Sequence, residues 1–236
     1  MPELPEVETV ARGLKKKILG QSINHILILD RKLKNRALST LRNLSVKDVF
    51  RHGKQVALAL SDRSYLLIHL RMTGNLIWAK NSREKSKRNL GGVILKQTKF
   101  SENLKSTRVV IVTEKGNVHF TDTRRFGTIE LRRSLPATGI DPLSSAFDAQ
   151  GLKQLLLSTN QPLKSFLMRQ DKIVGIGNIY ASEILFRAKI NPRRKTLSLK
   201  NVEIKLLAKE IKKVLTQAIQ CCGTTFSDYH GIDGDA

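Results

Sequence analysis

The apolar residues of this chain change from strand spacing to helical spacing near Pro136, and this change restricts the fold more than any other feature. Between residues 23 and 131, apolar and polar residues alternate in eight short runs separated by Gly, Asn and Asp, which predicts half-buried β-strands. After Pro136, apolar residues recur every three or four positions, which predicts helices. Strands followed by helices are typical of an α+β chain with an antiparallel sandwich. The expected strands are 23–29, 44–50, 56–60, 65–70, 75–78, 109–113, 118–121 and 128–131.

The same patterns predict three regions, residues 1–135, 136–220 and 221–236. An amphipathic helix over 7–18 precedes the strands, and a mixed-charge stretch over 80–105 is expected to be a basic insertion between two of them. The second region is expected to be wholly helical, and the third is a short tail. The helices expected after Pro136 are 147–157, 163–169, 179–188 and 202–219.

Positive charge dominates the composition, with 42 Lys and Arg against 20 Asp and Glu and a formal net charge of +22. An excess of this size indicates a polyanionic partner, most often nucleic acid.

Because the chain has no long uncharged apolar run and no leader, we expect no membrane attachment and a cytoplasmic protein. The cysteines, Cys221 and Cys222, are adjacent, so they lack metal-ligand spacing and we expect no zinc site.

The first residues after Met1, PELPEVE, carry groups suited to an attack on carbon. Initiator methionine is normally removed before a small residue, so we expect Pro2 to become the amino terminus. An α-amino group has a pKa of about 7.7–8.0 against about 10.4 for lysine, so more of it is neutral and nucleophilic. Attack on a sugar C1′ would give an iminium, and Glu3 and Glu6 are nearby acids. The segment also fits a plain lead-in to a helix, with glutamates near its positive end.

Two turns between expected strands, HLRMTG and DTRRFG, place large side chains where cores are not usually built. The first contains Met72, and the second contains Arg124, Arg125 and Phe126. An apolar wedge flanked by arginine is the kind of group that unstacks a base pair. Each turn by itself also fits ordinary packing of a flexible methionine or an aromatic ring.

Two further positions have a functional and a structural interpretation. Lys54 lies at a turn after an expected strand, where it is either a reactive lysine or one rim lysine of a basic protein. The segment 171–178, which carries two glycines, joins two expected helices, and Asn178 stands where it caps the second helix or holds a phosphate. A helix hairpin without a ligand explains these glycines equally well.

Together, PELPEVE, Lys54, HLRMTG, DTRRFG, VGIGNIYASE and GTTFSDY resemble, in order and spacing, the bacterial formamidopyrimidine-DNA glycosylase family over nearly the whole chain. The resemblance implies a catalytic β-sandwich flanked by helices over 1–135, a helix-two-turn-helix DNA-binding domain over 136–220 and a shortened lesion loop and tail over 221–236. It implies a bifunctional glycosylase and lyase of base excision repair that removes 8-oxoguanine and formamidopyrimidines from double-stranded damaged DNA. We expect a monomer associated with the nucleoid.

The resemblance also implies a role for each matching residue. Pro2 would be the Schiff-base nucleophile, Glu3 the acid that aids ring opening, and Glu6 a support for the pocket. Lys54 would donate a proton during β-elimination and hold a phosphate. The DNA-contacting residues would be Met72, Arg124 and Phe126 in the vacated site, Arg125, Lys164 and Asn178 on phosphates, and Thr224, Thr225 and Tyr229 in the lesion loop.

Several positions depart from the family pattern. The family's zinc hairpin, whose arginine assists δ-elimination, is missing from the sequence, so we expect no cofactor and weaker δ-elimination. Ser106 stands where the family has a DNA-contacting histidine, the segment 158–161 lacks a basic residue expected before Lys164, and Cys222 replaces a glycine. A degenerate relative that binds damaged DNA without turnover is therefore the alternative hypothesis. A ribosomal-type basic protein fits the charge but leaves Pro2 and the two turns unexplained.

Overall fold

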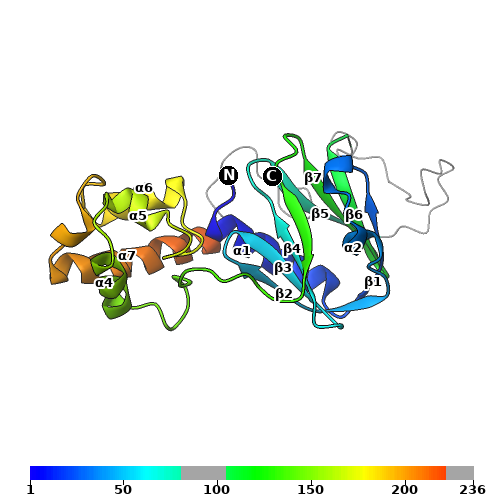
Figure 1. Cartoon of the computed structure of the whole chain (residues 1–236), viewed down its shortest axis with the longest axis horizontal. Helices are drawn as coiled ribbons and strands as arrows, with labels where there is room; N and C mark the ends of the chain where they lie inside the picture. Colours follow the sequence, from blue (N-terminus) through cyan, green and yellow to red (C-terminus); the bar gives the residue numbers. More distant parts are fainter. Residues whose placement is uncertain (81–104, 222–236) are drawn as a thin grey trace. The chain divides into compact units, whose positions relative to one another are not determined.

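The structure is a computed structural model that describes residues 1–80 and 105–221. Its contacts divide the chain into two units (Figure 1). Among the described residues, Val10–Leu135 form a strand unit, and Pro2–Thr9 group with residues 136–221 in a helical unit. The expected basic insertion, apart from its ends, and the expected lesion loop with Thr224, Thr225 and Tyr229 lie outside the described residues. No helix within the described ranges combines the length and apolarity that a membrane crossing requires.

The strand unit contains all eight expected strands. They form one antiparallel sheet, in the order β5-β7-β6-β1-β2-β3-β4-β8. Only two register pairs, Ser22 with Ser45 and Ile23 with Leu44, join β1 to β2. The sheet therefore consists of two four-stranded halves with a narrow connection, and the predictions of an α+β chain and an antiparallel sheet are confirmed. The strands are β1 (Ser22–Ile28), β2 (Leu44–His52), β3 (Gln55–Leu60), β4 (Tyr65–His69), β5 (Gly74–Lys80), β6 (Thr107–Thr113), β7 (Gly116–Asp122) and β8 (Thr128–Arg132).

Helix α1, Leu4–Ile18, begins three residues before the apolar repeat predicted. Pro5 is compatible with this earlier start, because the first turn of a helix needs no N–H donor from proline. Its last turn carries three lysines that favour the negative end of the helix, and one of them, Lys15, pairs with Asp48 of β2 at 2.7 Å. The helix ends before Gly20, which has a φ of 77°. Glycine adopts this left-handed conformation at little energetic cost.

The helical unit contains α4 (Ala149–Leu157), α5 (Leu163–Leu167), α6 (Asn178–Arg187) and α7 (Asn201–Gln220). These confirm the four helices predicted after Pro136. Helix α4 begins two residues later than expected because Asp148 caps it, its carboxylate accepting the N–H of Gly151 at 2.7 Å. Buried apolar side chains from all four helices form one core, together with Leu4 of α1.

Three shorter helices escaped the sequence patterns because periodicity needs a longer segment. Asp30 and Asn35 cap two of them through side-chain hydrogen bonds to the N–H groups of Lys32 and Ala37. These elements are η1 (Arg31–Leu33), α2 (Arg36–Ser39) and η2 (Thr196–Ser198).

Candidate active site and nucleic-acid interface

The carboxylate of Glu3 caps the N-terminus of helix α6. Its side chain is buried, and it accepts the backbone N–H groups of Gly177 at 2.7 Å, Ile179 at 2.9 Å and Tyr180 at 3.3 Å. The first N–H groups of a helix have no partner within the helix and lie at its positive end, so a carboxylate is a favourable cap. Glu3 is therefore fixed by a segment that follows it by more than 170 residues in the sequence.

Glu6 forms the second half of this cluster. Its Oε2 accepts the N–H of Glu3 at 2.8 Å, and its Oε1 accepts the hydroxyl of Tyr180 at 2.6 Å. Both Glu6 and Tyr180 are buried. Pro2, also buried, immediately precedes this anchored segment. The structure thus brings three predicted residues, Pro2, Glu3 and Glu6, into one buried cluster of the helical unit.

Two glycines allow the loop before α6 to approach the amino terminus closely. A Cβ on Gly177 would lie 2.4 Å from the carboxyl carbon of Glu3, and a Cβ on Gly175 would lie 2.7 Å from Cδ1 of Leu4. Gly175 also has a φ of 95°, which other residues rarely adopt. The side chain of Gln170 holds this loop by accepting the N–H of Gly175 at 2.9 Å and donating to the carbonyl of Ile176 at 2.8 Å.

Asn178 and Lys164 occupy the first turns of α6 and α5. Asn178 is exposed, and Gly177 is the cap position without a side-chain cap bond, so the capping interpretation of Asn178 is wrong. Its amide is not occupied in a cap and remains a candidate phosphate ligand. Lys164 is half-buried at the start of α5.

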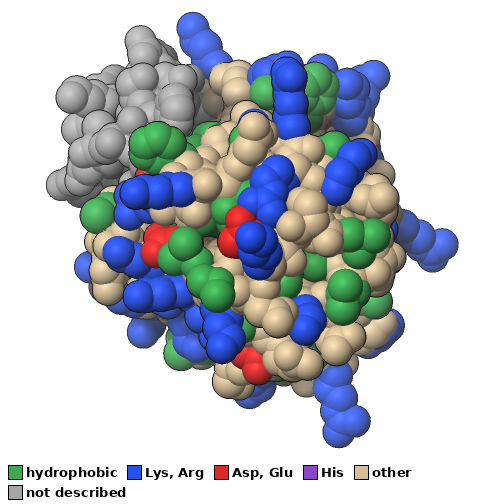
Figure 2. Space-filling view, turned by 90° about the vertical axis from the view of Figure 1, so that its left-hand side faces the viewer, with side chains coloured by type: hydrophobic (Ala, Val, Ile, Leu, Met, Phe, Trp, Pro, Cys, Tyr) green, Lys and Arg blue, Asp and Glu red, His purple; other side chains and the backbone are tan. Residues whose placement is uncertain are grey.

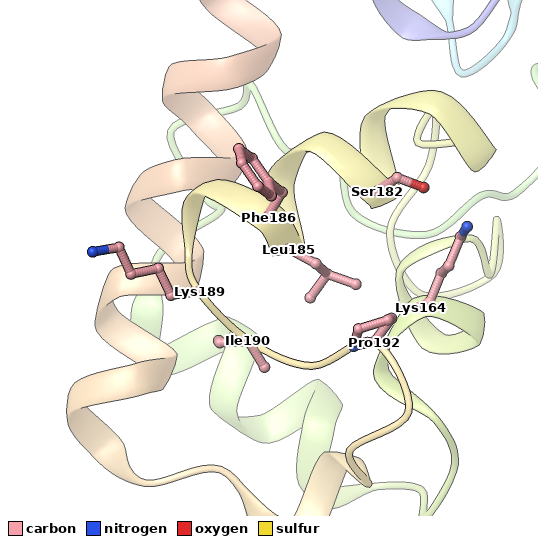
Figure 3. Close-up of a pocket in the computed structure, with 7 residues that line it drawn as sticks. All are labelled: Lys164, Ser182, Leu185, Phe186, Lys189, Ile190 and Pro192. Carbon is pink, nitrogen blue, oxygen red and sulfur yellow. The ribbon is translucent and has the colours of Figure 1, made fainter.

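Lys164 also borders a pocket of about 460 Å³ beside α5 and α6 (Figure 3). The lining is mainly apolar, with Lys164 and Lys189 as its basic side chains. Neither Pro2 nor Glu3 contributes to it, so this pocket is separate from the amino-terminal cluster. The lining residues are Lys164, Ser182, Leu185, Phe186, Lys189, Ile190 and Pro192.

The strand unit brings the three candidate wedge residues together at its β4–β5 and β7–β8 turns. The side chains of Met72 and Phe126 are about half exposed, at 48% and 51%. The guanidinium of Arg124 contacts both, with Nη1 3.2 Å from Sδ of Met72 and the central carbon 4.9 Å from the centre of the Phe126 ring. A cation over an aromatic face is attractive, so the trio forms a small exposed cluster.

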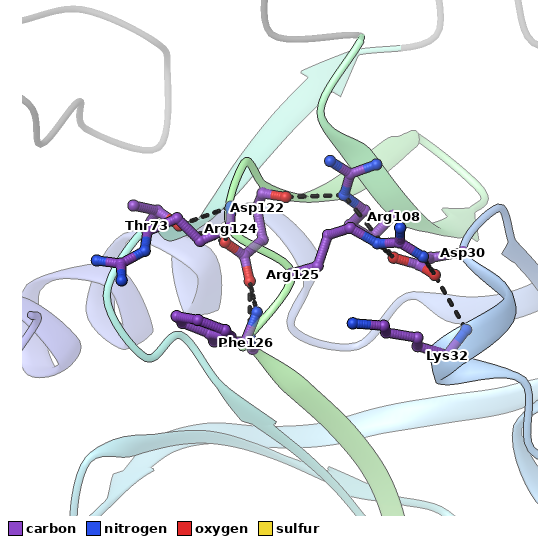
Figure 4. Close-up of polar contacts among 9 residues, drawn as sticks. Asp30, Lys32, Thr73, Arg108, Asp122, Arg124, Arg125 and Phe126 are labelled. Atoms are coloured by element: carbon purple, nitrogen blue, oxygen red, sulfur yellow. Dashed lines mark hydrogen bonds and ion pairs between the residues drawn. The ribbon is translucent and has the colours of Figure 1, made fainter.

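Asp122, at the end of β7, accepts hydrogen bonds from the two turns that carry this cluster (Figure 4). One oxygen accepts the Thr73 hydroxyl and the N–H of Arg124, and the other accepts the N–H groups of Phe126 and Gly127. Gly127 is required here because a Cβ would lie 2.4 Å from the Phe120 ring.

Arg125, a predicted phosphate ligand, is held by Asp30 in a bidentate ion pair. Its Nε lies 2.7 Å from Oδ2 and its Nη2 2.5 Å from Oδ1 (Figure 4). The hydrogen bonds from Arg125 lower the pKa of Asp30 to about 2, even though burial acts in the opposite direction. Arg108 adds a weaker contact to Asp30 at 3.9 Å. The pair places the Arg125 guanidinium but also neutralises part of its charge.

Lys54 lies in the tight turn between β2 and β3, half-buried. It contributes, after burial and Arg71, to lowering the pKa of His69 to about 4. His69 is therefore neutral near pH 7, and its Nδ1 accepts the N–H of Arg71 at 3.1 Å. Lys54 belongs to the strand unit, and the Pro2 cluster belongs to the helical unit.

The surface chemistry fits a polyanion. On the face shown in Figure 2, Lys and Arg side chains are spread widely, and Asp and Glu side chains are few. Within residues 1–80 and 105–221, no group of three or more His, Cys, Asp or Glu side chains is placed to hold a metal ion.

Sequence reasoning missed four residues that organise these sites, namely Thr73, Asp30, Asp122 and Tyr180. Asp122 and Thr73 stand inside the DTRRFG and HLRMTG motifs, so their positions gave a signal that was not used. Tyr180 follows the glycine loop within VGIGNIYASE. Asp30 gave no signal, because its partner Arg125 lies 95 residues away.

Two family models match the chain. The model described as Formamidopyrimidine-DNA glycosylase N-terminal domain matches residues 1–129, and that described as Formamidopyrimidine-DNA glycosylase H2TH domain matches residues 138–230. The Formamidopyrimidine-DNA glycosylase of Desulfitobacterium hafniense is 35% identical over 248 residues, which cover 100% of this chain and 84% of the relative.

Solved structures are similar across both units. The crystal structure of the MutM (Fpg) protein from Thermus thermophilus gives a TM-score of 0.81 at 32% identity, covering 99% of this chain and 82% of that chain. The Lactococcus lactis formamidopyrimidine-DNA glycosylase, non-covalently bound to DNA containing an AP site, gives a TM-score of 0.78 at 29% identity. That match covers 94% of this chain and 83% of the other.

Proposed function

Because the chain belongs to the formamidopyrimidine-DNA glycosylase family, we propose that it is a bifunctional DNA glycosylase and abasic-site lyase of base excision repair. Its proposed substrates are oxidised purines, 8-oxoguanine and formamidopyrimidines, in double-stranded DNA. The observation that carries the proposal is the placement of Pro2 next to Glu3, whose carboxylate is fixed at the start of α6. A candidate nucleophile thus lies beside an acidic group that is already oriented.

Removal of Met1 turns the ring nitrogen of Pro2 into a secondary amine. The amine attacks C1′ of the damaged nucleotide, the bond to the base breaks, and the base leaves with a proton. Ring opening gives an iminium, which acidifies the C2′ hydrogen. Loss of this proton and of the 3′ phosphate is the β-elimination, and hydrolysis of the iminium frees Pro2. We assign proton transfer to Glu3 and Lys54, and the support of Glu3 to Glu6.

DNA recognition is assigned to both units. Met72, Arg124 and Phe126 are proposed to fill the space left by the everted nucleotide, because their exposed side chains already cluster at one edge of the strand unit. Backbone phosphates are assigned to Arg125, Lys164 and Asn178. The lesion loop with Thr224, Thr225 and Tyr229 is proposed from the family resemblance.

The proposed reaction needs no metal or other cofactor, because an amine and two acids supply its chemistry. We propose a monomer that acts on genomic DNA inside the cell.

The test uses duplexes that carry one 8-oxoguanine opposite cytosine, one formamidopyrimidine, or one preformed abasic site. Mass spectrometry measures the released base, and gel electrophoresis identifies the strand ends. The proposal expects base release from both lesions and β-elimination at all three sites, with no release from undamaged DNA. Tight binding to the damaged duplexes without base release or cleavage would instead establish the degenerate DNA-binding alternative.

A further inference from the structure

Asp122 has a position that its motif alone does not explain. It is the last residue of β7 and is 1% exposed, although the turn that follows it is at the surface. A buried carboxylate is costly unless its oxygens are hydrogen-bonded. Both oxygens of Asp122 accept hydrogen bonds, and all of the donors belong to the β4–β5 and β7–β8 turns.

The four donors are divided between the oxygens in a way that joins the turns. Oδ1 accepts the hydroxyl of Thr73, from the β4–β5 turn, and the N–H of Arg124 at 3.1 Å. Oδ2 accepts the N–H groups of Phe126 at 2.8 Å and Gly127 at 2.7 Å. Two segments 49 residues apart are thus tied to one side chain (Figure 4).

The two turns need such an anchor because each has one strained arginine. Arg71 and Arg125 have φ values of 55° and 57°, in the left-handed region that residues other than glycine rarely adopt. Such conformations are energetically unfavourable and persist only where the surroundings fix them. The main chain of Asp122 is itself fixed, with its N–H bound to the carbonyl of Ser106 at 2.9 Å and its carbonyl to Nε of Arg108 at 2.7 Å.

We propose that Asp122 is the positioning residue of the DNA wedge: its carboxylate fixes the Met72 turn and the Arg124–Phe126 turn as one rigid unit, so that these side chains can enter the duplex together. This inference rests on the proposed function, because it assumes that the three side chains unstack DNA. Without the carboxylate, Met72, Arg124 and Phe126 remain present but lose their fixed relative placement. Nucleotide eversion then weakens, while the chemistry at Pro2 does not.

The first test variant is Asp122→Asn, which keeps the size and removes one acceptor. Whichever way its amide is turned, the NH₂ group faces two donors that the carboxylate accepted. The second pair is Thr73→Val, which removes the hydroxyl that donates to Asp122 and accepts the N–H of Arg124 at 3.2 Å, and Thr73→Ser, which restores it. A role in joining the turns predicts weaker eversion in Thr73→Val and recovery in Thr73→Ser.

Two measurements separate positioning from chemistry. Eversion is followed by the fluorescence of 2-aminopurine placed beside a tetrahydrofuran site in a duplex, a signal that needs no catalysis. Elimination is followed on a single-stranded oligonucleotide with a preformed abasic site, which needs no wedge. We expect Asp122→Asn to slow the eversion signal by about tenfold or more, an effect of roughly 1.4 kcal/mol on the barrier. Elimination on the single strand should change by less than about threefold.

A matched control is Asp148→Asn, which changes another aspartate that accepts a backbone N–H, at the cap of α4 in the helical unit. It should lower the melting temperature without slowing eversion. The inference is overturned if Asp122→Asn, folded by its melting curve, everts DNA at the wild-type rate. If Asp122→Asn does not fold, the Thr73 pair decides, and a wild-type rate in Thr73→Val overturns the inference. Failure of the proposed function gives a different result, no elimination by the wild-type chain.

Discussion

The N–H of Gly177 donates to Oε2 of Glu3 at 2.7 Å, and this contact is short because residue 177 has no side chain. A Cβ there would lie 2.4 Å from the carboxyl carbon of Glu3. We therefore expect Gly177→Ala to displace the Glu3 carboxylate from the start of α6 and to reduce base release by about tenfold or more. Single-turnover excision of 8-oxoguanine measures this effect. Gly151→Ala, in the first turn of α4, is the control and should leave excision unchanged, and equal loss in both variants would contradict the assignment.

Tyr180→Phe tests the hydroxyl that supports Glu6. The change removes a buried hydrogen bond of 2.6 Å to Oε1 and leaves that oxygen without its tyrosine donor. Loss of a buried hydrogen bond to a carboxylate is expected to lower the free energy of unfolding by about 1–3 kcal/mol. Urea denaturation at pH 7.5 measures the loss, and Tyr65→Phe in β4 is the matched removal of a hydroxyl from the other unit. Unchanged stability in Tyr180→Phe would show that the hydroxyl gives Glu6 no net support.

Asp30→Asn tests whether the negative charge of Asp30 partly neutralises the positive charge of Arg125. The pKa of Asp30 is about 2, so the carboxylate is ionised at any pH used for DNA binding, and the substitution removes one negative charge beside Arg125. If Arg125 contacts a phosphate, the slope of log K against log salt should become steeper by about one unit. Fluorescence anisotropy on an abasic-analogue duplex across a salt series measures the slope.

Asp62→Asn is the control for that change. Asp62 pairs with Arg133 at the opposite end of β4 from the wedge, so this variant has the same change in net charge without altering Arg125. It should leave the slope close to wild type. An equal steepening in both variants would attribute the effect to net charge and would remove Arg125 from the set of phosphate contacts.

His69 gives the protein a pH dependence of stability between pH 6.5 and 4. Burial, with Arg71 and Lys54, lowers its pKa from 6.5 to about 4, so the unfolded chain binds its proton first as the pH falls. The neutral form therefore contributes its full stability above pH 6.5, and this is lost progressively down to pH 4, by at most about 3 kcal/mol. Buried His119, whose pKa is also lowered, adds a contribution of the same sign.

His69→Asn isolates the contribution of His69. The Asn side-chain oxygen can accept the N–H of Arg71 in place of Nδ1 but does not titrate. The difference in unfolding free energy between pH 7.5 and pH 5, from urea denaturation, should be smaller in this variant than in the wild type. An identical difference in both proteins would mean that His69 titrates normally in the folded state.

The sequence alone was sufficient to predict the strands and helices in which apolar residues recur at a regular spacing. All eight strands and the five longer helices lie where the spacing predicts them, because burial of one face imposes the period. The cap at Asp148 shifted the start of α4, and the helices of three or four residues gave no period. The motif turns also pointed to Met72, Arg124 and Phe126, whose side chains cluster in the structure; their role as a wedge stays a prediction.

Long-range contacts could not be predicted in this way. The cap of α6 is Glu3, from the other end of the chain, and not the neighbouring Asn178. Likewise, the partner that fixes Arg125 is Asp30, which belongs to a loop with no recognisable motif. Such pairs depend on which loops the fold brings together, and local spacing carries no information about that.

The most direct test of the account is borohydride trapping on a duplex with one 8-oxoguanine opposite cytosine, using chain whose amino-terminal mass shows that Met1 is removed. The account predicts a covalent protein–DNA adduct that peptide mapping locates at Pro2, and its loss in Pro2→Gly. An adduct that maps to a lysine and persists in Pro2→Gly would contradict the assignment of Pro2 as the nucleophile. Absence of any adduct, both here and on a preformed abasic site, would contradict the proposed lyase.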